Sequence, residues 1–346
     1  MMAGMSRRWK QRPPGSNWGD FGADDQLGRL NLLTRQKVLE GIAEVKEGRS
    51  FCLSLPLDLP GDSVLNPRRG PPRLRPTELA GVPFMNRPLS HADARNTDVI
   101  CDDEVTLSLQ YSTQWDSFAH VGQWFDADGD GEPEKVYYNG YRAHEHILGP
   151  GDAGVGPAGS SRALALGVDG FAASGLQGRG VLVDLHARFG RRRVLVGHDE
   201  LTDILRADGV ELEAGDILLL HTGFAEVLVE MDRHPDADIL SRSCAVLDGR
   251  DPRLLELITA SGVAALCADN YAVEAYPARD AEGRRAALPL HEHCLFKLGV
   301  PLGELWWLTE LAAWLRVHGR HRFLLTAPPL RLPGAVGSPV TPVATV

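Results

Sequence analysis

Asp116 and His120 are the residues whose types and spacing most directly suggest chemistry in this chain. A carboxylate and an imidazole four positions apart can act on one water molecule, the first as a ligand of a metal ion and the second as a general base. The alternative is that the pair forms only a hydrogen bond that orders a turn. The residues before the pair bear on this choice.

The segment before Asp116 alternates between apolar and polar side chains, and this pattern predicts a half-buried strand over Val105–Tyr111. If the extended path continues, Gln110, Gln114 and Asp116 share one polar face. Two amides and a carboxylate on one face are unusual for a solvent-exposed strand, although a solvated strand edge is the alternative. The face is therefore a candidate for binding or catalysis.

The same segment resembles the motif H-x-x-[GS]-T-H-x-D-x-P-x-H of the cyclase-like family of metal-dependent hydrolases, which includes bacterial kynurenine formamidases and isatin hydrolases. Thr113, Asp116 and His120 match this motif. Glutamine stands at positions 110 and 114, where the family has metal-binding histidines, and Phe118 stands in place of the proline. The chain is similar to a longer branch of the family.

Further segments carry the resemblance from about residue 18 to residue 346. Trp18–Asn31 resembles the opening signature, Gly215–Gly223 resembles the strand G-D-x-x-L-x-x-T-G, and 329–342 is similar to the end of family members. The resemblance implies an α/β protein with a swivelling β/β/α fold, in which a mixed sheet has flanking helices. It also implies one catalytic domain over residues 18–346. The basic, Pro-containing residues 1–17 are expected to form a disordered tail.

The resemblance further implies a metal site. Most of its candidate ligands are oxygen donors, a set that favours manganese, magnesium or calcium over zinc. The loss of two imidazoles leaves open that no metal binds. The candidate ligands are Gln110, Gln114, Asp116, His291 and Glu304.

Two alternatives concern the second half of this site. The resemblance implies that His291 is the ligand rather than the neighbouring His293, because the spacing from His291 to Glu304 fits the family's pattern. Glu304 is expected to open a helix over 304–316, where an acid could act only through the positive end of the helix dipole.

Candidate substrate-binding residues are Trp115, Phe118, Asn270 and Glu274. Aromatic side chains around the motif could form a wall for a cyclic substrate, with core packing as the alternative for each of them. The resemblance implies that Asn270 and Glu274 lie near the substrate pocket.

Asp126, Asp128 and Asp130 form the first half of a calcium loop of the EF-hand type. The twelfth position is Tyr137 rather than glutamate, and no helix pair flanks the loop. A polar turn between strands is the favoured interpretation, with calcium binding as the alternative.

Bulk properties exclude several classes of protein. A formal net charge of −10 argues against nucleic-acid binding, and no apolar run approaches the ~18 residues of a membrane helix. The five cysteines are scattered, and no secretory h-region precedes them, so a cytoplasmic enzyme is expected.

Other strands are expected at 180–185, 217–221 and 263–269, and other helices at 199–207 and 252–261. The Pro- and Arg-rich segment 56–98 is expected to be an irregular loop that serves as a lid or as a subunit-interface arm. We expect a homodimer or homotetramer, in which Arg68, Arg69 or Arg73 could approach a neighbouring site.

These observations favour a metal-dependent hydrolase, similar to arylformamidases, that opens an amide or lactam C–N bond in a small cyclic or aryl substrate. His120 would activate the attacking water. One alternative is a polyketide-type ring cyclase or lyase in which His120 abstracts a carbon-bound proton. The other is a metal-free protein that binds a small molecule.

Overall fold

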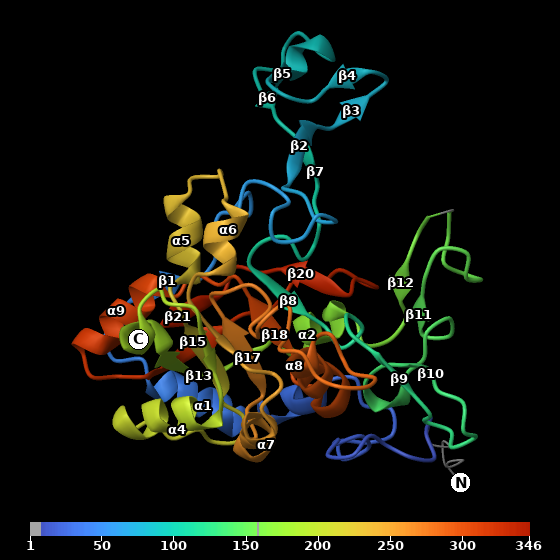
Figure 1. Cartoon of the computed structure of the whole chain (residues 1–346). Helices are drawn as coiled ribbons and strands as arrows, with labels where there is room; N and C mark the ends of the chain where they lie inside the picture. The colour runs from blue at the N-terminus through green and yellow to red at the C-terminus, as the bar shows by residue number, and fades with distance from the viewer. Residues whose placement is uncertain (1–7, 158) are drawn as a thin grey trace.

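The computed structural model describes residues 8–157 and 159–346. Its centre is a curled sheet in the strand order β1-β21-β19-β13-β15-β17-β18-β8-β20 (Figure 1). The neighbouring pairs from β13 to β18 are parallel, and the other pairs are antiparallel. The bounds of these strands are β1 Ser50–Cys52, β8 Gln114–Asp116, β13 Gln177–Asp184, β15 Ile217–His221, β17 Ala265–Ala268, β18 Leu302–Glu304, β19 Arg322–Thr326, β20 Gly337–Pro339 and β21 Val343–Thr345.

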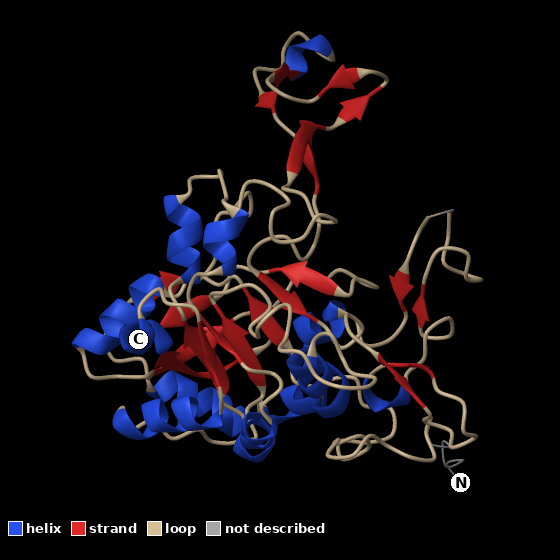
Figure 2. Ribbon diagram, viewed as in Figure 1, coloured by secondary structure: helices blue, strands red, loops and turns tan. Residues whose placement is uncertain are grey.

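Helices flank this sheet (Figure 2), which confirms the expected α/β class with a mixed sheet. The α-helices are α1 Arg35–Ala43, α2 Val168–Ser174, α3 Leu185–Phe189, α4 His198–Ala207, α5 Phe224–Glu230, α6 Ala237–Ser241, α7 Pro252–Ser261, α8 Pro289–His291 and α9 Thr309–Val317. Short 3-10 helices cover Gly28–Leu32, Leu89–His91 and Tyr138–Gly140, and a π-helix, Glu292–Leu298, follows α8.

Local sequence explains where several helices begin and end. The hydroxyl of Thr34 accepts a hydrogen bond from the backbone N–H of Lys37 and caps α1. In α7, Asp251 is the N-cap and Pro252 the first residue, and Gly262 ends the helix in the left-handed region. The predicted bounds of α7 are therefore confirmed.

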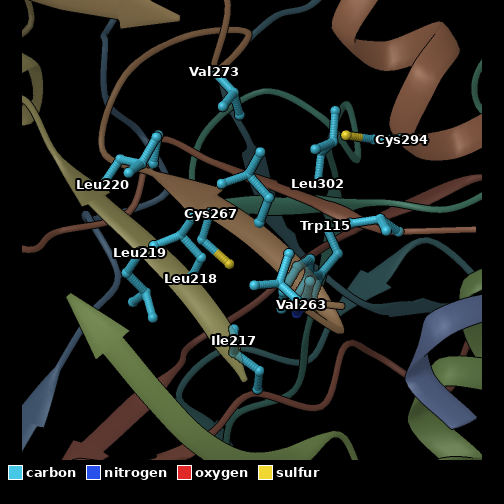
Figure 3. Packing of buried hydrophobic residues seen from close by; sticks show 14 of the residues in the cluster. Trp115, Ile217, Leu218, Leu219, Leu220, Val263, Cys267, Val273, Cys294 and Leu302 are labelled. Carbon is cyan, nitrogen blue, oxygen red and sulfur yellow. The ribbon is translucent and has the colours of Figure 1, made fainter. Parts of the chain in front are cut away.

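The core lies around the parallel strands. Every residue of β15 and β17 is buried, as expected for strands with both faces covered. Figure 3 shows Leu218, Leu219 and Cys267 in this packing, with Trp115 of β8 beside them. The sheet is thus a rigid support for the polar side chains at the ends of its strands.

The segment expected to be an irregular loop at 56–98 includes an arm of short antiparallel pairs that projects from the body (Figure 1). Apolar side chains on it are exposed, including Leu74, Leu79 and Val99. Its strands are β2 Arg73–Pro76, β3 Glu78–Leu79, β4 Val82–Pro83, β5 Arg87–Pro88, β6 Val99–Ile100 and β7 Asp103–Thr106.

Three smaller strand pairs complete the fold. They are β9 Gln123–Phe125 with β10 Glu134–Val136, β11 Ile147–Leu148 with β12 Arg162–Ala163, and β14 Val194–Val196 with β16 Ala245–Leu247.

Three expectations differ from the structure. The strand predicted over Val105–Tyr111 ends at Thr106, because the chain turns before β8 through a hydrogen bond from the Tyr111 N–H to the Ser108 carbonyl. Glu304 ends strand β18 instead of opening a helix, and α9 begins only at Thr309. Residues 8–17 were expected to be disordered, but Trp9 is buried against Trp18.

Residues 1–7 of the expected tail lie outside the described residues. Within the described part of the chain, no helix is long and apolar enough to cross a membrane.

Candidate metal centre

Two neighbouring strands and one short helix bring Asp116, Glu304 and His291 together. Strands β8 and β18 are antiparallel, with Asp116 opposite Leu302 and Glu304 opposite Gln114. His291 Nε2 lies 3.3 Å from Glu304 Oε1 and 3.9 Å from Asp116 Oδ2. One ligand atom from each of the three residues lies within 4.8 Å of the others, and all three side chains are buried. This arrangement is a candidate metal centre.

Three oxygens at this centre are buried without a hydrogen-bond partner: Oε1 of Gln114 and both carboxylate oxygens of Asp116. The amide nitrogen of Gln114 donates a hydrogen bond to Glu304 Oε2 at 2.9 Å, because a carboxylate can only accept. The amide oxygen of Gln114 therefore points away from Glu304 Oε2 and has no partner. Buried polar atoms are almost always satisfied, and hard divalent cations prefer oxygen ligands. The residues therefore fit a bound divalent cation.

Glu274 holds His291 in position. One of its carboxylate oxygens lies 2.8 Å from Nδ1 of His291 and accepts the His291 backbone N–H at 3.0 Å. The other oxygen accepts the Leu290 backbone N–H at 3.0 Å. The Nδ1–H is thereby engaged, and Nε2 is left to face Asp116 and Glu304. Glu274, expected near the substrate pocket, thus orients a candidate ligand.

The pKa shifts of Asp116 and His291 also indicate that this centre would favour a bound cation. Burial, followed by the nearby Glu304 carboxylate, raises the pKa of Asp116 to about 8. Burial by itself would lower the pKa of His291, but its hydrogen bonds to Glu274 and Glu304 raise it to about 10. The buried carboxylates thus carry more negative charge than their surroundings neutralise, so protons are retained where a cation would also bind.

His120 lies at the edge of this cluster, with Nε2 3.8 Å from Asp116 Oδ2 and its side chain 20% exposed. Burial, together with the positive charge of His291, lowers the pKa of His120 to about 3. A neutral imidazole can accept a proton. His120 lines a cavity of ≈ 80 Å³ together with His291 and Glu304. His120 is therefore placed to act on a molecule bound beside the candidate ligands.

Gln110 lies apart from the other candidate ligands in its contacts. Its side-chain amide packs against Gly337, where an added Cβ would lie only 2.3 Å from Gln110 Nε2. Its backbone carbonyl accepts a hydrogen bond from Arg69. Among the described residues, its side chain forms no hydrogen bond with Gln114, Asp116, His291 or Glu304. The early end of the predicted strand explains this difference.

Trp115 and Phe118 were expected to contact substrate, but both are fully buried in the core. Trp115 donates to the carbonyl of Ala327 and packs edge to face on Trp306. Phe118 packs against Tyr138 and against a phenylalanine of α2. They fill space behind the strand, as its alternation allows.

Asn270 and His293 have different surroundings. Asn270 donates to the carbonyl of Ala245 and lines a cavity next to the candidate centre. His293 Nε2 lies 2.9 Å from the Thr259 hydroxyl of α7. The geometry thus places His291, and not His293, with Asp116.

The acidic loop joins β9 to β10. Asp126 accepts the backbone N–H groups of Gly129, Asp130 and Gly131, which are the bonds of a polar turn. Asp126, Asp128 and Glu134 are close enough to offer ligand atoms to one ion, but Asp130 does not belong to that group. The loop has strands on both sides, so it lacks the helices of an EF-hand.

Several residues around the candidate centre have no signal in the motif. Arg68, Arg69 and Tyr271 line the same cavity as His120. Arg68 and Arg69 line this cavity of their own chain, and their expected approach to a neighbouring site stays a prediction. Their only sequence signal was a pair of arginines in a Pro-rich segment.

A third cluster of possible metal ligands lies at the carboxyl ends of β13 and β15. Asp184, His186 and His221 offer ligand atoms within 4.8 Å of one another. Asp184 also pairs with Arg316 and with His221 Nδ1, so this group already has internal partners.

Comparison with solved structures shows which known proteins share this fold. A crystal structure described as that of a novel cyclase is 30% identical, with a TM-score of 0.74, and the match covers 97% of this chain and 100% of that one. Isatin hydrolase A from Labrenzia aggregata bound to benzyl benzoate is 15% identical, with a TM-score of 0.52, covering 90% of this chain and 98% of that one. Isatin hydrolase A from Ralstonia solanacearum is 17% identical, with a TM-score of 0.51 and coverage of 90% and 97%.

None of the curated proteins matches this chain. The family model described as "Putative cyclase" matches residues 53–275, which include the motif around Asp116 together with Asn270 and Glu274. This match and the 30% identity over nearly the whole chain agree with the resemblance in the motif. The chain belongs to the cyclase family.

Proposed function

We propose that this protein is a metal-dependent hydrolase that opens an amide or lactam C–N bond in a small cyclic or aryl substrate. The observation that carries the proposal is the buried group Asp116, His291 and Glu304, whose unpartnered oxygens lie beside a neutral His120. The fold shared with proteins named isatin hydrolases supports the hydrolytic class, since isatin is itself a lactam.

Asp116, His291 and Glu304 would hold the ion, and the amide oxygen of Gln114 is a further donor. A bound divalent cation supplies Lewis acidity, which polarises a carbonyl and lowers the pKa of water. The oxygen-rich donor set favours manganese, magnesium or calcium over zinc. Gln110 is not part of this proposed set, because within the described residues its side chain forms no hydrogen bond with the other candidate donors.

The protein's own residues would supply the remaining steps. His120 would accept a proton from the attacking water at Nε2 and return it to the leaving nitrogen. Glu274 would keep the Nδ1–H of His291 engaged, so that His291 Nε2 stays directed at the ion. Tyr271 and Arg69, which line the cavity, would position the substrate.

The test combines elemental analysis with hydrolysis in labelled water. Protein purified without chelator should contain about one equivalent of manganese, magnesium or calcium, because three of the four proposed donors, those of Asp116, Glu304 and Gln114, are oxygens. With Mn²⁺ added, formanilide or isatin should be hydrolysed, and one ¹⁸O atom from water should enter the carboxylate product. Stoichiometric zinc that survives mild chelation would contradict the ion assignment. A product without the label would contradict hydrolysis and favour a lyase or cyclase.

A further inference from the structure

Two arginines stand at the mouth of the catalytic cavity. Arg68 and Arg69 line it together with His120, His291 and Glu304. They belong to the segment that leads into the projecting arm, whereas the candidate ligands come from the central sheet and α8. The cavity is therefore lined by one buried carboxylate, that of Glu304, and by two guanidinium groups that are more exposed.

Neither arginine forms a direct ion pair in the described part of the chain, although the charge of Arg69 also acts on the buried carboxyls of Asp116 and Glu304. Within residues 8–157 and 159–346, no carboxylate lies within ion-pairing distance of Arg68 or Arg69, although most other arginines form such pairs. Each arginine instead donates a hydrogen bond to an uncharged oxygen. Arg69 Nη1 donates to the carbonyl of Gln110 at 2.7 Å, and Arg68 Nε donates to the amide oxygen of Asn66 at 3.3 Å.

The other N–H groups of these guanidiniums have no hydrogen-bond partner among the residues that the structure describes. Asn66 is buried, which fixes the base of the turn that carries both arginines. An arginine held at one N–H presents the rest of its planar fork to a carboxylate.

With a divalent cation bound, the net charge around the cavity would favour the binding of an anion. A divalent cation and the two arginines together carry four positive charges, against three buried carboxylates, those of Asp116, Glu274 and Glu304. The mouth of the cavity would therefore be electropositive once a cation is bound, although the whole chain has a formal net charge of −10. Such a local field attracts and orients a small anion.

A second cavity of ≈ 260 Å³ adjoins the first and offers space for the rest of the molecule. The two cavities share Tyr271 and Tyr276, whose rings pack edge to face with centroids 6.4 Å apart. The second cavity is mostly apolar. Its side chains include those of Val64, Leu65, Phe224 and Leu240.

We propose that the substrate is a carboxylate-bearing amide or lactam, whose carboxylate binds Arg68 and Arg69 and whose apolar part enters the cavity behind Tyr271 and Tyr276. This rests on the proposed function only in placing the scissile carbonyl beside Asp116 and His291. The arginine pair would select anionic substrates over neutral ones of equal shape, because an unpaired carboxylate gains two charge-assisted contacts there.

Binding of benzoate and its neutral isostere benzamide tests the anion subsite apart from catalysis. Calorimetry with the Mn²⁺-loaded protein should give at least tenfold tighter binding of benzoate. In the double variant Arg68→Gln/Arg69→Gln, this ratio should fall toward one. Arg188→Gln is the matched control, since Arg188 lines a different groove and has no ion pair within the described residues, and its ratio should not change.

The double variant Arg68→Lys/Arg69→Lys guards against a folding defect, because it keeps the charge and loses the fork. Its ratio should lie between those of the wild type and the glutamine variant. Equal binding of benzoate to the wild type and the glutamine variant would overturn the proposal, since the carboxylate would then bind the ion. No preference for benzoate in the wild type would overturn it as well.

Hydrolysis of 4-formamidobenzoate and of its methyl ester separates this proposal from the proposed function. A higher kcat/KM for the acid that depends on Arg68 and Arg69 supports both. If benzoate binds through the arginines but neither compound is hydrolysed, the anion site stands and amide hydrolysis falls. If both compounds are hydrolysed with equal kcat/KM, hydrolysis stands and the carboxylate-bearing substrate class falls.

Discussion

Replacement of Asp116 by asparagine tests the proposed centre through protein stability, without requiring the substrate. Asp116 is fully buried, and neither of its carboxylate oxygens has a hydrogen-bond partner. The pKa of its carboxyl is raised from 3.8 to about 8, first by burial and then by Glu304. In metal-free protein, the charge on Asp116 therefore opposes folding.

The sign and size of this effect follow from linkage. A folded-state pKa above the unfolded value means that the folded state binds the proton more tightly, so stability falls as pH rises from 3.8 and levels off above about 8. At about 1.4 kcal/mol per pH unit, the loss at pH 7 is on the order of 4 kcal/mol. The asparagine amide adds an unsatisfied buried donor, which costs about 1–3 kcal/mol.

Without metal at pH 7, Asp116→Asn should therefore be more stable than the wild type by roughly 1–3 kcal/mol. Near pH 4 the wild-type carboxyl is protonated in the folded state, so the advantage should vanish or reverse. Manganese should stabilise the wild type and have little effect on the variant, because a bound ligand stabilises only the state that binds it.

Urea unfolding followed by tryptophan fluorescence measures these differences at pH 4.5 and 7.5, with EDTA or with Mn²⁺. Asp103→Asn is the matched control, because it removes an acid from the exposed strand β7 and should not change the metal dependence. A less stable Asp116→Asn at pH 7.5 in EDTA would refute the electrostatic reasoning. Equal stabilisation of wild type and variant by Mn²⁺ would refute the assignment of Asp116 as a ligand.

Three further predictions concern orientation, catalysis and assembly. Glu274→Gln should weaken Mn²⁺ binding by about 10–100-fold in calorimetry, because the amide no longer holds both His291 and the Leu290 N–H, and unchanged affinity would contradict that role. His120→Ala should lower kcat by about 10²–10⁴-fold with an unaltered circular dichroism spectrum, and a normal rate would leave His120 with a structural role. Light scattering at micromolar concentration should show a homodimer or homotetramer, and deletion of arm residues 77–102, whose apolar side chains are exposed, should yield monomers. A monomeric wild type would contradict this assembly.

Several features of the fold were predictable because they depend on local physical chemistry. The cap at Thr34, the helix after Asp251 and the apolar strand at 217–221 follow from capping preferences and continuous hydrophobic runs. The strand before the motif was predicted too long, since alternation does not reveal the turn at Ser108. Glu304 was placed in a helix because the apolar residues after it fit either period.

The sequence by itself determined which chemistry this chain can offer. The spacing of Asp116 and His120, the glutamines in place of two histidines, and the later His291 and Glu304 defined an oxygen-rich set of candidate ligands. That information is local or follows from the family motif, so it did not require coordinates. It did not separate ligands from core residues within the motif, because the directions of the Gln114, Trp115 and Asp116 side chains depend on the strand that carries them.

The tertiary structure decided which of these groups meet. Pairing of β8 with β18 brings Asp116 and Glu304 into one buried cluster, and α8 adds His291. Glu274 and Arg69 acquired their places only there, since each contacts residues far away in the chain through the packing of loops onto the sheet. Burial then set the charge states, because a carboxyl group's pKa depends on how much water and countercharge the fold leaves around it.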